Sequence, residues 1–457
     1  MNTLEVINPA TGEVFKTLEA DTDETVRKKY ELLKSGQRLW AKVRVEDRIG
    51  KIKNFVTLLE SSIPVLSETL TEEMGKPLDQ SAGEIRGAIG RINFFIKNSI
   101  KWLSDEVIYE EEGLEERITF EPLGVIANIS AWNYPYLVGV NVYIPALIAG
   151  NSVFYKPSEY TSLTGLAIQN LLYEAGIPND VFQVVIGGAE AGESLLNLPL
   201  DGYFFTGSVK TGKYIYEKVA SKMVPCQVEL GGKDPMYVHA DNKDIESVAA
   251  AAVEGAFYNN GQSCCAVERI YVNEKVYDIF IDEFVTLTKA MKLGDPKEGG
   301  VFVGPLARKE QVVFLKGQVE DAIAKGATVM TGGKPVDRKG FYFEPTVLID
   351  VNHTMRVMTE ESFGPVIGIQ KVAGDDEAVQ LMKDTEYGLA AAVYSDHEET
   401  ALPLLMQMDT GTVYWNCCDR VSPNLPWSGR RNSGLGVTLS YMGIRAFTQP
   451  KGYHMRG

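Results

Sequence analysis

The chain has 457 residues, 45% of them hydrophobic, which is enough for two or three domains with substantial cores. Its formal net charge of -16 argues against nucleic acid or an anionic membrane as a partner, because both require a basic surface. The five cysteines are odd in number and lack the C-x-x-C spacing of a metal site, so we expect no metal, no disulfide framework and a reduced, cytoplasmic compartment.

Three helices are predicted near the N-terminus, because apolar residues recur at helical spacing over residues 25–39, 45–70 and 81–102. The first residues lack a basic stretch followed by an apolar run, so no signal peptide is expected. An acidic segment, 104–121, follows the helices and contains the alternating sequence ERITFE. This pattern predicts a hairpin that reaches away from the body.

The segment from Leu123 to Tyr155 contains no charged residue and is long enough to suggest a transmembrane helix. Asparagines, serines and two prolines interrupt it, however. A buried strand, a loop and a helix are therefore the preferred interpretation, and no membrane partner is expected.

Four short runs rich in β-branched and aromatic residues predict strands with helix-length spacers between them. They are GVIANIS (124–130), SVFYKPS (152–158), VFQVVIG (181–187) and GYFFTGS (202–208). The last run leads directly into a helix that is predicted to begin near Thr211. This alternation is typical of a doubly wound parallel sheet.

A second set of elements after residue 230 predicts another α/β domain. Strands are expected at PMYVHA, RIYVNE, YFEPTVLID and VIGIQKV, and helices at 245–258 and 276–291. No Gly/Ser-rich linker separates the two sets. We therefore expect the two domains to pack tightly, with a cleft between them.

Two motifs at strand ends are candidates for binding a nucleotide. In FFTGSVKTG (204–212), glycines at a strand-to-helix turn would let the backbone approach a phosphate, although a simple tight turn explains the motif equally well. In FYKPSE, Lys156 and Glu159 could hold a ribose, and the alternative is a solvated Lys–Glu pair with Ser158 as a helix cap.

Two further motifs place a polar side chain among apolar residues. Asn133 of ISAWNYPY must find partners if it is buried, and it could stabilise an oxyanion or simply cap a turn before proline. Glu229 of VELGGKDP is either a general base with a raised pKa or a salt-bridged structural carboxylate.

The segment NNGQSCCAVER contains a candidate nucleophile, Cys264, after a glycine-containing loop. Its neighbour Cys265 is expected to be a packing residue. The chain has four histidines and none of them lies in these motifs, so a Cys–His hydrolase is poorly supported. The base is better sought among the carboxylates.

The order and spacing of these motifs resemble the aldehyde dehydrogenase superfamily over nearly the whole chain. The matching pieces are AWNYP, KPSE, FTGSVKTG, ELGGK, GQSC, EESFGP and PWSGRRNSG. The resemblance implies that Cys264 is the nucleophile, Glu229 the general base and Asn133 the oxyanion amide. It also implies NAD(P)-dependent oxidation of an aldehyde to a carboxylate through a thiohemiacetal and a thioester on Cys264, without acyl transfer to coenzyme A.

The resemblance further implies a set of cofactor contacts. Lys156 and Glu159 would hold the adenosine ribose, Gly207, Ser208 and Gly212 the pyrophosphate, and Glu361 and Phe363 the nicotinamide ribose. Trp132, Ser158 and Leu230 complete the implied cofactor-binding set. A carboxylate at Glu159 favours NAD, because it would repel a 2′-phosphate, with NADP as the alternative.

The implied architecture has a Rossmann-like cofactor domain (1–103 and 123–229), an α/β catalytic domain (230–446) and a small β oligomerisation arm (104–122 and 447–457). It implies a homodimer or a homotetramer. The chain departs from the family pattern at Val142, where many members carry lysine, and at VTLSYMG, where many are rich in glutamate. A non-catalytic member and a coenzyme A-acylating enzyme are the competing interpretations.

The aldehyde itself is not evident from the motifs. Specificity is expected to come from an entry tunnel near Tyr136, Asn141, Ser263 and residues 417–424. Arg430 and Arg431 could attract a carboxylated semialdehyde, or they could be ordinary surface charges.

Overall fold

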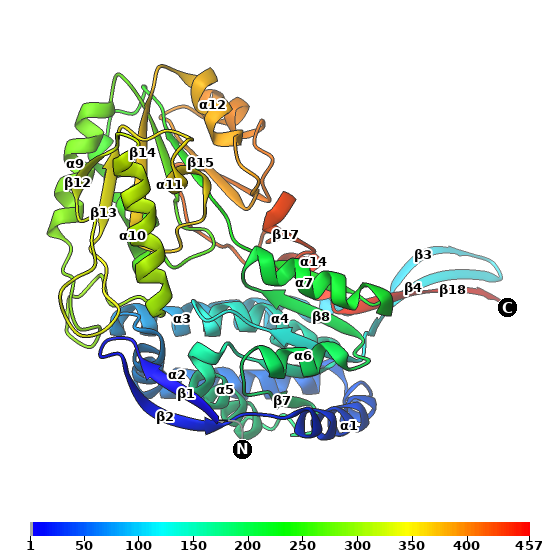
Figure 1. Ribbon diagram of the computed structural model, residues 1–457. Coiled ribbons are helices and arrows are strands. Elements are labelled where there is room, and N and C mark those ends of the chain that lie inside the picture. The colour runs from blue at the N-terminus through cyan, green and yellow to red at the C-terminus, as the bar shows by residue number, and fades with distance from the viewer. Residues whose placement is uncertain (1–2) are drawn as a thin grey trace.

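The computed structural model describes residues 3–457, so residues 1–2, which begin the predicted cofactor domain, lie outside the described part. Figure 1 shows two α/β bodies and a thin β arm that projects from one of them. The first body is built mainly from residues 23–229 and the second from residues that follow them. An antiparallel hairpin opens the described chain and lies against the first body. Its strands are β1 (Thr3–Asn8) and β2 (Glu13–Glu19).

Three long helices follow the hairpin, as predicted, with wider bounds than the apolar spacing indicated. They are α1 (Asp23–Trp40), α2 (Val45–Met74) and α3 (Leu78–Leu103). Thr22 and Thr25 form a capping box that fixes the start of α1. Gly75, in the left-handed conformation, ends α2 and lets the chain turn into α3.

The first sheet has six strands in the order β17-β9-β8-β5-β6-β7, and all except β17 run parallel. The four predicted strands are all present. The strands are β5 (Val125–Ile129), β6 (Ser152–Lys156), β7 (Phe182–Val184), β8 (Gly202–Thr206), β9 (Cys226–Glu229) and β17 (Gly434–Leu435).

Helices connect these strands and cover both faces of the sheet (Figure 1). They are α4 (Pro135–Ala149), α5 (Ser162–Glu174), α6 (Ala189–Asn197) and α7 (Val209–Val219). Helix α7 begins two residues before the predicted Thr211, because the Ser208 hydroxyl accepts a hydrogen bond from the Thr211 amide and so caps the helix earlier.

The uncharged segment Leu123–Tyr155 forms β5, α4 and most of β6, which confirms the strand, loop and helix interpretation. Helix α4 is buried along nearly its whole length. Apolar residues can surround this helix because other helices and the sheet cover it on every side. Within residues 3–457, no helix is long and apolar enough to cross a membrane.

The second sheet has seven strands in the order β12-β13-β14-β11-β10-β15-β16, with only β12 antiparallel to its neighbour. The four predicted strands are present here too. The strands are β10 (Pro235–Val238), β11 (Arg269–Asn273), β12 (Thr328–Thr331), β13 (Thr346–Ile349), β14 (Val366–Val372), β15 (Ala390–Tyr394) and β16 (Thr412–Trp415).

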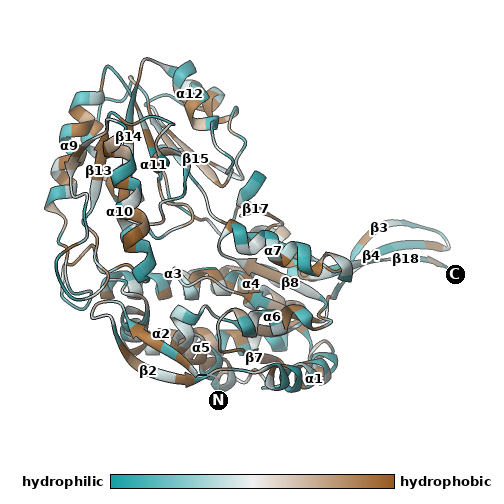
Figure 2. Ribbon diagram, viewed as in Figure 1, coloured by the Kyte–Doolittle hydropathy of each residue, from teal (hydrophilic) through white to brown (hydrophobic). Residues whose placement is uncertain are grey.

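Two hydrophobic cores cover the two faces of this sheet, so its central strands read as continuous apolar runs. In Figure 2 these strands are largely brown, while the outer surfaces of the helices are teal. The covering helices are α8 (Ile245–Phe257), α9 (Tyr277–Ala290), α10 (Lys309–Ala324), α11 (Arg356–Thr359), α12 (Asp375–Lys383) and α13 (Glu398–Leu405).

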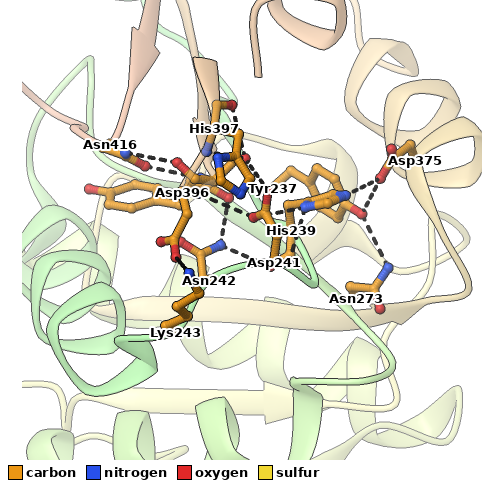
Figure 3. A network of polar contacts seen from close by, with 12 residues as sticks. Tyr237, His239, Asp241, Asn242, Lys243, Asn273, Asp375, Asp396, His397 and Asn416 are labelled. Carbon is orange, nitrogen blue, oxygen red and sulfur yellow. Dashed lines mark hydrogen bonds and ion pairs between the residues drawn. The ribbon is translucent and has the colours of Figure 1, made fainter. Parts of the chain in front are cut away.

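Polar side chains at the carboxyl edge of the second sheet bind mainly one another (Figure 3). His239, just after β10, lies 2.9 Å from the Asp241 carboxylate, and the Tyr237 hydroxyl donates to Asp375 at 2.7 Å. Asn242 donates to the Tyr394 carbonyl at 2.7 Å. The polar groups at this edge therefore find their hydrogen-bond partners within the second body. The loops that face the first body instead lie at the amino ends of β10, β11 and β14.

The segment after α3 forms a hairpin, as predicted, and the C-terminal strand joins it. The three-stranded sheet has the order β18-β4-β3 and consists of β3 (Glu106–Glu111), β4 (Leu114–Pro122) and β18 (Thr448–Arg456). Before β18, the chain passes through β17 and α14 (Ser440–Arg445), which packs against α3 and α4. Residues 434–445 therefore lie against the first body.

Candidate active site

A cavity of about 870 Å³ lies where the two bodies face each other. It is lined by the carboxyl ends of strands in the first sheet and by loops that precede strands in the second. Twelve of the residues singled out in the sequence line it: Trp132, Asn133, Lys156, Ser158, Glu159, Gly207, Ser208, Glu229, Leu230, Cys264, Glu361 and Phe363. In a parallel sheet this edge is the usual place for a ligand.

Lys156, at the end of β6, is buried rather than solvated. Its side chain is only 5% exposed, and its Nζ donates to the Pro157 carbonyl at 3.3 Å. Burial lowers the pKa of this ammonium group, and Glu159 opposes that effect. A solvated Lys–Glu pair therefore does not describe this motif. Ser158 lines the cavity and also accepts a hydrogen bond from the Tyr160 amide, so it both caps and faces the site.

The glycine-rich turn after β8 places Gly207 and Ser208 on the cavity wall and the N-terminus of α7 beside it. Gly212 does not line the cavity. It lies one turn into α7, where a Cβ atom would come within 2.3 Å of the Leu230 side chain. Gly212 therefore lets α7 pack closely on Leu230, and its contribution to the cavity is indirect.

Cys264 lies in the loop between a short 3-10 helix (Tyr258–Gly261) and β11. Asn259 and Asn260 have φ of 53° and 57°, a left-handed conformation that non-glycine residues rarely adopt. Their side chains hold the loop in place: Asn260 Nδ2 donates to the Pro305 carbonyl at 2.7 Å, and Asn259 Nδ2 donates to the Gln262 carbonyl at 3.0 Å. The loop is fixed before any ligand arrives.

The two adjacent cysteines differ in their surroundings. Cys264 is partly exposed and lines the cavity, whereas Cys265 is 7% exposed and belongs to the hydrophobic core of the first body. The pKa of the Cys264 thiol is raised well above its usual value, first by the neighbouring Cys265 sulfur and then by burial and the negative charge of Glu229. The resting side chain is therefore a thiol that needs a base.

Asn133 is 4% exposed and connects the first body to the Cys264 loop. Its Nδ2 donates to the Gln262 carbonyl at 3.1 Å, so its amide does not cap its own turn. Its backbone carbonyl accepts from Asn259 Nδ2 at 3.1 Å and from Lys76 Nζ at 2.7 Å. An amide held by so many contacts is pre-organised to donate to an oxygen beside Cys264.

A buried ion pair between Lys76 and Glu84 supports Asn133, and neither residue was singled out in the sequence. Both side chains are completely buried. Glu84 also accepts from the Tyr136 amide at 2.8 Å, so the pair holds the backbone on both sides of Tyr134. A charged residue on the apolar face of a predicted helix, such as Glu84 between Ser81 and Ile85, was the available signal.

Glu229, the last residue of β9, faces the cavity. Among the described residues, its carboxylate forms no hydrogen bond or ion pair. Burial raises the pKa of Glu229 to about 7, and the positive charge of Arg91 limits the rise. A salt-bridged structural role is therefore excluded, and a carboxylate with this pKa can both accept and release a proton near neutral pH.

A second buried ion pair, Lys233–Glu268, shapes the opposite wall. Lys233 Nζ lies 2.6 Å from Glu268, and both side chains are almost fully buried. The two Glu268 oxygens accept the backbone amides of Ser362 and Phe363, each at 2.9 Å. The pair thereby fixes Phe363 with its φ of 46°. Glu268 precedes β11 in the cysteine motif, but only the fold brings it to residues 362–363.

Glu361 and Phe363 project from this fixed segment into the cavity. One Glu361 oxygen accepts from the Gly232 amide at 2.9 Å, and a Cβ atom at Gly231 would lie 2.1 Å from it. Burial raises the pKa of Glu361 to about 8. The Phe363 ring meets Trp132 edge-on, with centroids 5.4 Å apart.

Arg308, Gln311 and Tyr160 also line the cavity and were not predicted. Arg308 lies over the Trp132 ring at 5.5 Å, and Gln311 Nε2 donates to the Ser362 carbonyl at 2.6 Å. Arg308 and Gln311 lie in a stretch without a motif, so only their position in the fold identifies them, whereas Tyr160 directly follows the FYKPSE motif. Val142 lies in buried α4 and does not line this cavity.

Comparison with known proteins points to one family. The sequence profile described as the aldehyde dehydrogenase family matches residues 1–452. The chain is 33% identical to a succinate-semialdehyde dehydrogenase [NADP(+)] of Deinococcus radiodurans over 97% of this chain and 93% of that one. It is 32% identical to a peroxisomal aminoaldehyde dehydrogenase of Pisum sativum over 97% and 91%.

The fold agrees with this relationship. The structure of betaine aldehyde dehydrogenase from Staphylococcus aureus in complex with NAD⁺ superposes with a TM-score of 0.95 and 30% identity, over 100% of this chain and 92% of that one. The predicted α/β fold class is therefore confirmed. With a family profile over nearly all of its length, the chain belongs to the aldehyde dehydrogenase family.

Proposed function

We propose that the enzyme oxidises an aldehyde to a carboxylate with NAD or NADP, through a thiohemiacetal and a thioester on Cys264. The observation that carries the proposal is the convergence of Cys264, Glu229 and Asn133 on one cavity with the cofactor motifs. These groups come from two loops and the end of strand β9, which are distant in sequence. General acid–base chemistry, a sulfur nucleophile and an amide donor are the components that this reaction requires.

The cavity fits a dinucleotide. The N-terminus of α7, with Ser208 at its cap, offers amide groups suited to a pyrophosphate. Lys156 and Glu159 offer a donor and an acceptor for one ribose, and Glu361 offers a carboxylate oxygen for the other. We propose Trp132, Ser158, Gly207, Leu230 and Phe363 as the remaining cofactor contacts. When bound, the nicotinamide ring accepts a hydride from the substrate carbon.

The chain's own groups carry the remaining steps. Cys264 gives up its thiol proton to water or to Glu229, so loss of this carboxylate slows the first turnover without abolishing it. The thiolate attacks the aldehyde carbon, and the new alkoxide accepts hydrogen bonds from the Asn133 amide and the Cys264 backbone N–H. After hydride leaves, Glu229 releases any proton taken from Cys264 to solvent, and its carboxylate then removes a proton from the water that hydrolyses the thioester. This carboxylate favours hydrolysis over transfer to coenzyme A.

Replacing the nucleophile tests the proposal directly. We expect Cys264→Ala to lower the rate of aldehyde-dependent formation of reduced cofactor, measured by absorbance, by more than about 1,000-fold while cofactor binding persists. Cys265→Ala is the matched control and should keep most of the activity, because its sulfur lies in the core. If Cys265→Ala abolished oxidation and Cys264→Ala did not, the assignment would be reversed.

Replacing the base should separate the two halves of the reaction. We expect Glu229→Gln to slow thioester hydrolysis about 100-fold while the first turnover is less affected, giving a visible burst of reduced cofactor in stopped flow. In the unmodified enzyme the hydrolysis rate should rise as pH increases through about 7, because only the ionised carboxylate is a base. Exposed Glu217→Gln is the control. Equal loss of burst and steady state would contradict this role.

The preferred cofactor is proposed to be NAD, on the strength of the Glu159 carboxylate. We expect kcat/KM for NAD to exceed that for NADP by at least about tenfold, because the carboxylate repels a 2′-phosphate. Glu159→Gln should lower the ratio of kcat/KM for NAD to kcat/KM for NADP, mainly by raising kcat/KM for NADP. Glu174→Gln, at the exposed end of α5, should not change this ratio. Steady-state kinetics with both cofactors measure the ratio. A preference of the unmodified enzyme for NADP would refute the proposal.

We propose the predicted division into cofactor domain, catalytic domain and oligomerisation arm, with residues 434–445 assigned to the cofactor domain. The five cysteines are free, which supports a cytoplasmic location. The arm supports assembly into a dimer or tetramer, because it projects from the body and carries exposed apolar residues. Val107, Ile108 and Tyr109 are each between 47% and 59% exposed to solvent. A second copy of the chain is the proposed occupant of this apolar strand.

A charge on the arm should weaken that assembly. We expect light scattering to give two or four chains per particle for the unmodified protein and a smaller particle for Ile108→Lys, since a buried unpaired lysine is costly at an interface. Val313→Lys, an exposed apolar position on α10, is the control and should leave the mass unchanged. A monomeric unmodified protein would contradict the proposal.

A further inference from the structure

Arg91 is a charged residue near the active site that the mechanism above does not use. It lies on α3, is partly buried and makes two hydrogen bonds through one nitrogen: Nη1 donates to the Leu137 carbonyl and to the Asn141 Oδ1, both at 3.1 Å. Both acceptors are neutral. Among the described residues, no carboxylate forms an ion pair with Arg91, and its Nε and Nη2 donors have no partner.

The side chain lies beside the reacting groups. Its two acceptors belong to α4, which follows Asn133 directly, and Gly87, one turn before Arg91, faces the Leu137 side chain. The charge of Arg91 acts on Cys264, Cys265 and Glu229, and it is the charge that opposes the effect of burial on Glu229. A guanidinium that is partly removed from water without an ion-pair partner is costly, and a bound anion would offset that cost.

Arg430 and Arg431, the two cations that the sequence offered for a semialdehyde, are already paired. Arg431 Nε lies 2.8 Å from the Asp409 carboxylate, and Arg430 contacts the same carboxylate at 3.3 Å. These two arginines are therefore surface charges rather than a site for a semialdehyde. Tyr136, predicted near the tunnel, is fully buried in the core, while Asn141 is a partner of Arg91.

One acidic group also acts on this region. Asp419, in the loop before β17, interacts electrostatically with Cys265 and has a pKa raised to about 6 by burial. It lies 3.8 Å from Arg420, so its charge is partly compensated. Glu229 is the carboxylate that interacts most strongly with Arg91, and because its pKa is raised to about 7 it is only partly ionised near neutral pH. The permanent charge of Arg91 therefore favours an anionic substrate over a cationic one.

We propose that Arg91 binds the carboxylate of an ω-carboxylated aldehyde and so makes a short dicarboxylic semialdehyde the preferred substrate. The two free donors, Nε and Nη2, can bind both oxygens of one carboxylate, which is the geometry that arginine recognises best. The aldehyde end then reaches Cys264 while the carboxylate stays at α3. This inference rests on the proposed aldehyde oxidation and adds a specificity residue to it.

Matched substrates separate the two proposals. Succinic semialdehyde and butanal have the same number of carbons, and 4-aminobutanal adds the opposite charge. We expect kcat/KM of the unmodified enzyme to be at least about tenfold higher for the semialdehyde than for butanal, and lowest for 4-aminobutanal. Activity on butanal without preference for the semialdehyde, or preference for the amine, would overturn the role of Arg91 alone. No oxidation of any of the three would overturn the proposed function.

Substitution then tests the residue itself. We expect Arg91→Met to lower the selectivity ratio, kcat/KM for succinic semialdehyde divided by that for butanal, by about 30-fold, mainly through KM for the semialdehyde. Arg91→Lys, which keeps the charge but not the paired donors, should give an intermediate ratio. Arg86→Met, an exposed arginine on the same helix, is the control and should leave the ratio unchanged.

The selectivity ratio distinguishes carboxylate recognition by Arg91 from a purely structural role of this residue. If Arg91 only supported Leu137 and Asn141, both substrates would lose the same factor and the ratio would not move, which would overturn the proposal. If Arg91→Met failed to fold, the selectivity ratio of Arg91→Lys would still test the proposal. Succinate should also inhibit butanal oxidation competitively in the unmodified enzyme and less in Arg91→Lys, and absence of inhibition would contradict carboxylate binding.

Discussion

The site depends on the hydrogen bonds that join Asn133 to the loop carrying Cys264. Asn133 donates to the Gln262 carbonyl, and Asn259 donates back to the Asn133 carbonyl. These bonds link a segment that follows the first sheet to a loop that precedes a strand of the second. They set the position of the sulfur relative to the amide, and therefore relative to every group on the cavity wall.

Buried ion pairs support both sides of this junction in the same way. Lys76–Glu84 lies behind Asn133, and Lys233–Glu268 lies behind Phe363. The Glu84 carboxylate also accepts the Tyr136 amide in the first turn of α4, directly after Asn133, and the Glu268 carboxylate accepts the Phe363 amide in the loop that faces the cavity. Burying two charges is costly unless further hydrogen bonds complete them, so each pair is stable only when its loop is in place.

Burial also sets the chemistry of the site. It raises the pKa of Glu229 to about 7 and that of Glu361 to about 8, and it lowers the pKa of Lys156. The walls that exclude water thus keep the groups near the point at which they exchange protons. Arg91 moderates this effect for Glu229, so a residue proposed for substrate recognition also influences the base.

The sequence by itself determined the fold class, four strands of each sheet, the hairpin and the motifs that line the cavity, because apolar periodicity and turn residues are local properties. Tertiary structure alone decided the environment of each group. It paired Lys76 with Glu84, brought Glu268 to the Phe363 segment, moved Gly212 from the cavity wall into helix packing and paired Arg430 and Arg431 with Asp409. Charge pairing and pKa depend on which distant segments pack together and exclude water, and no local pattern specifies that.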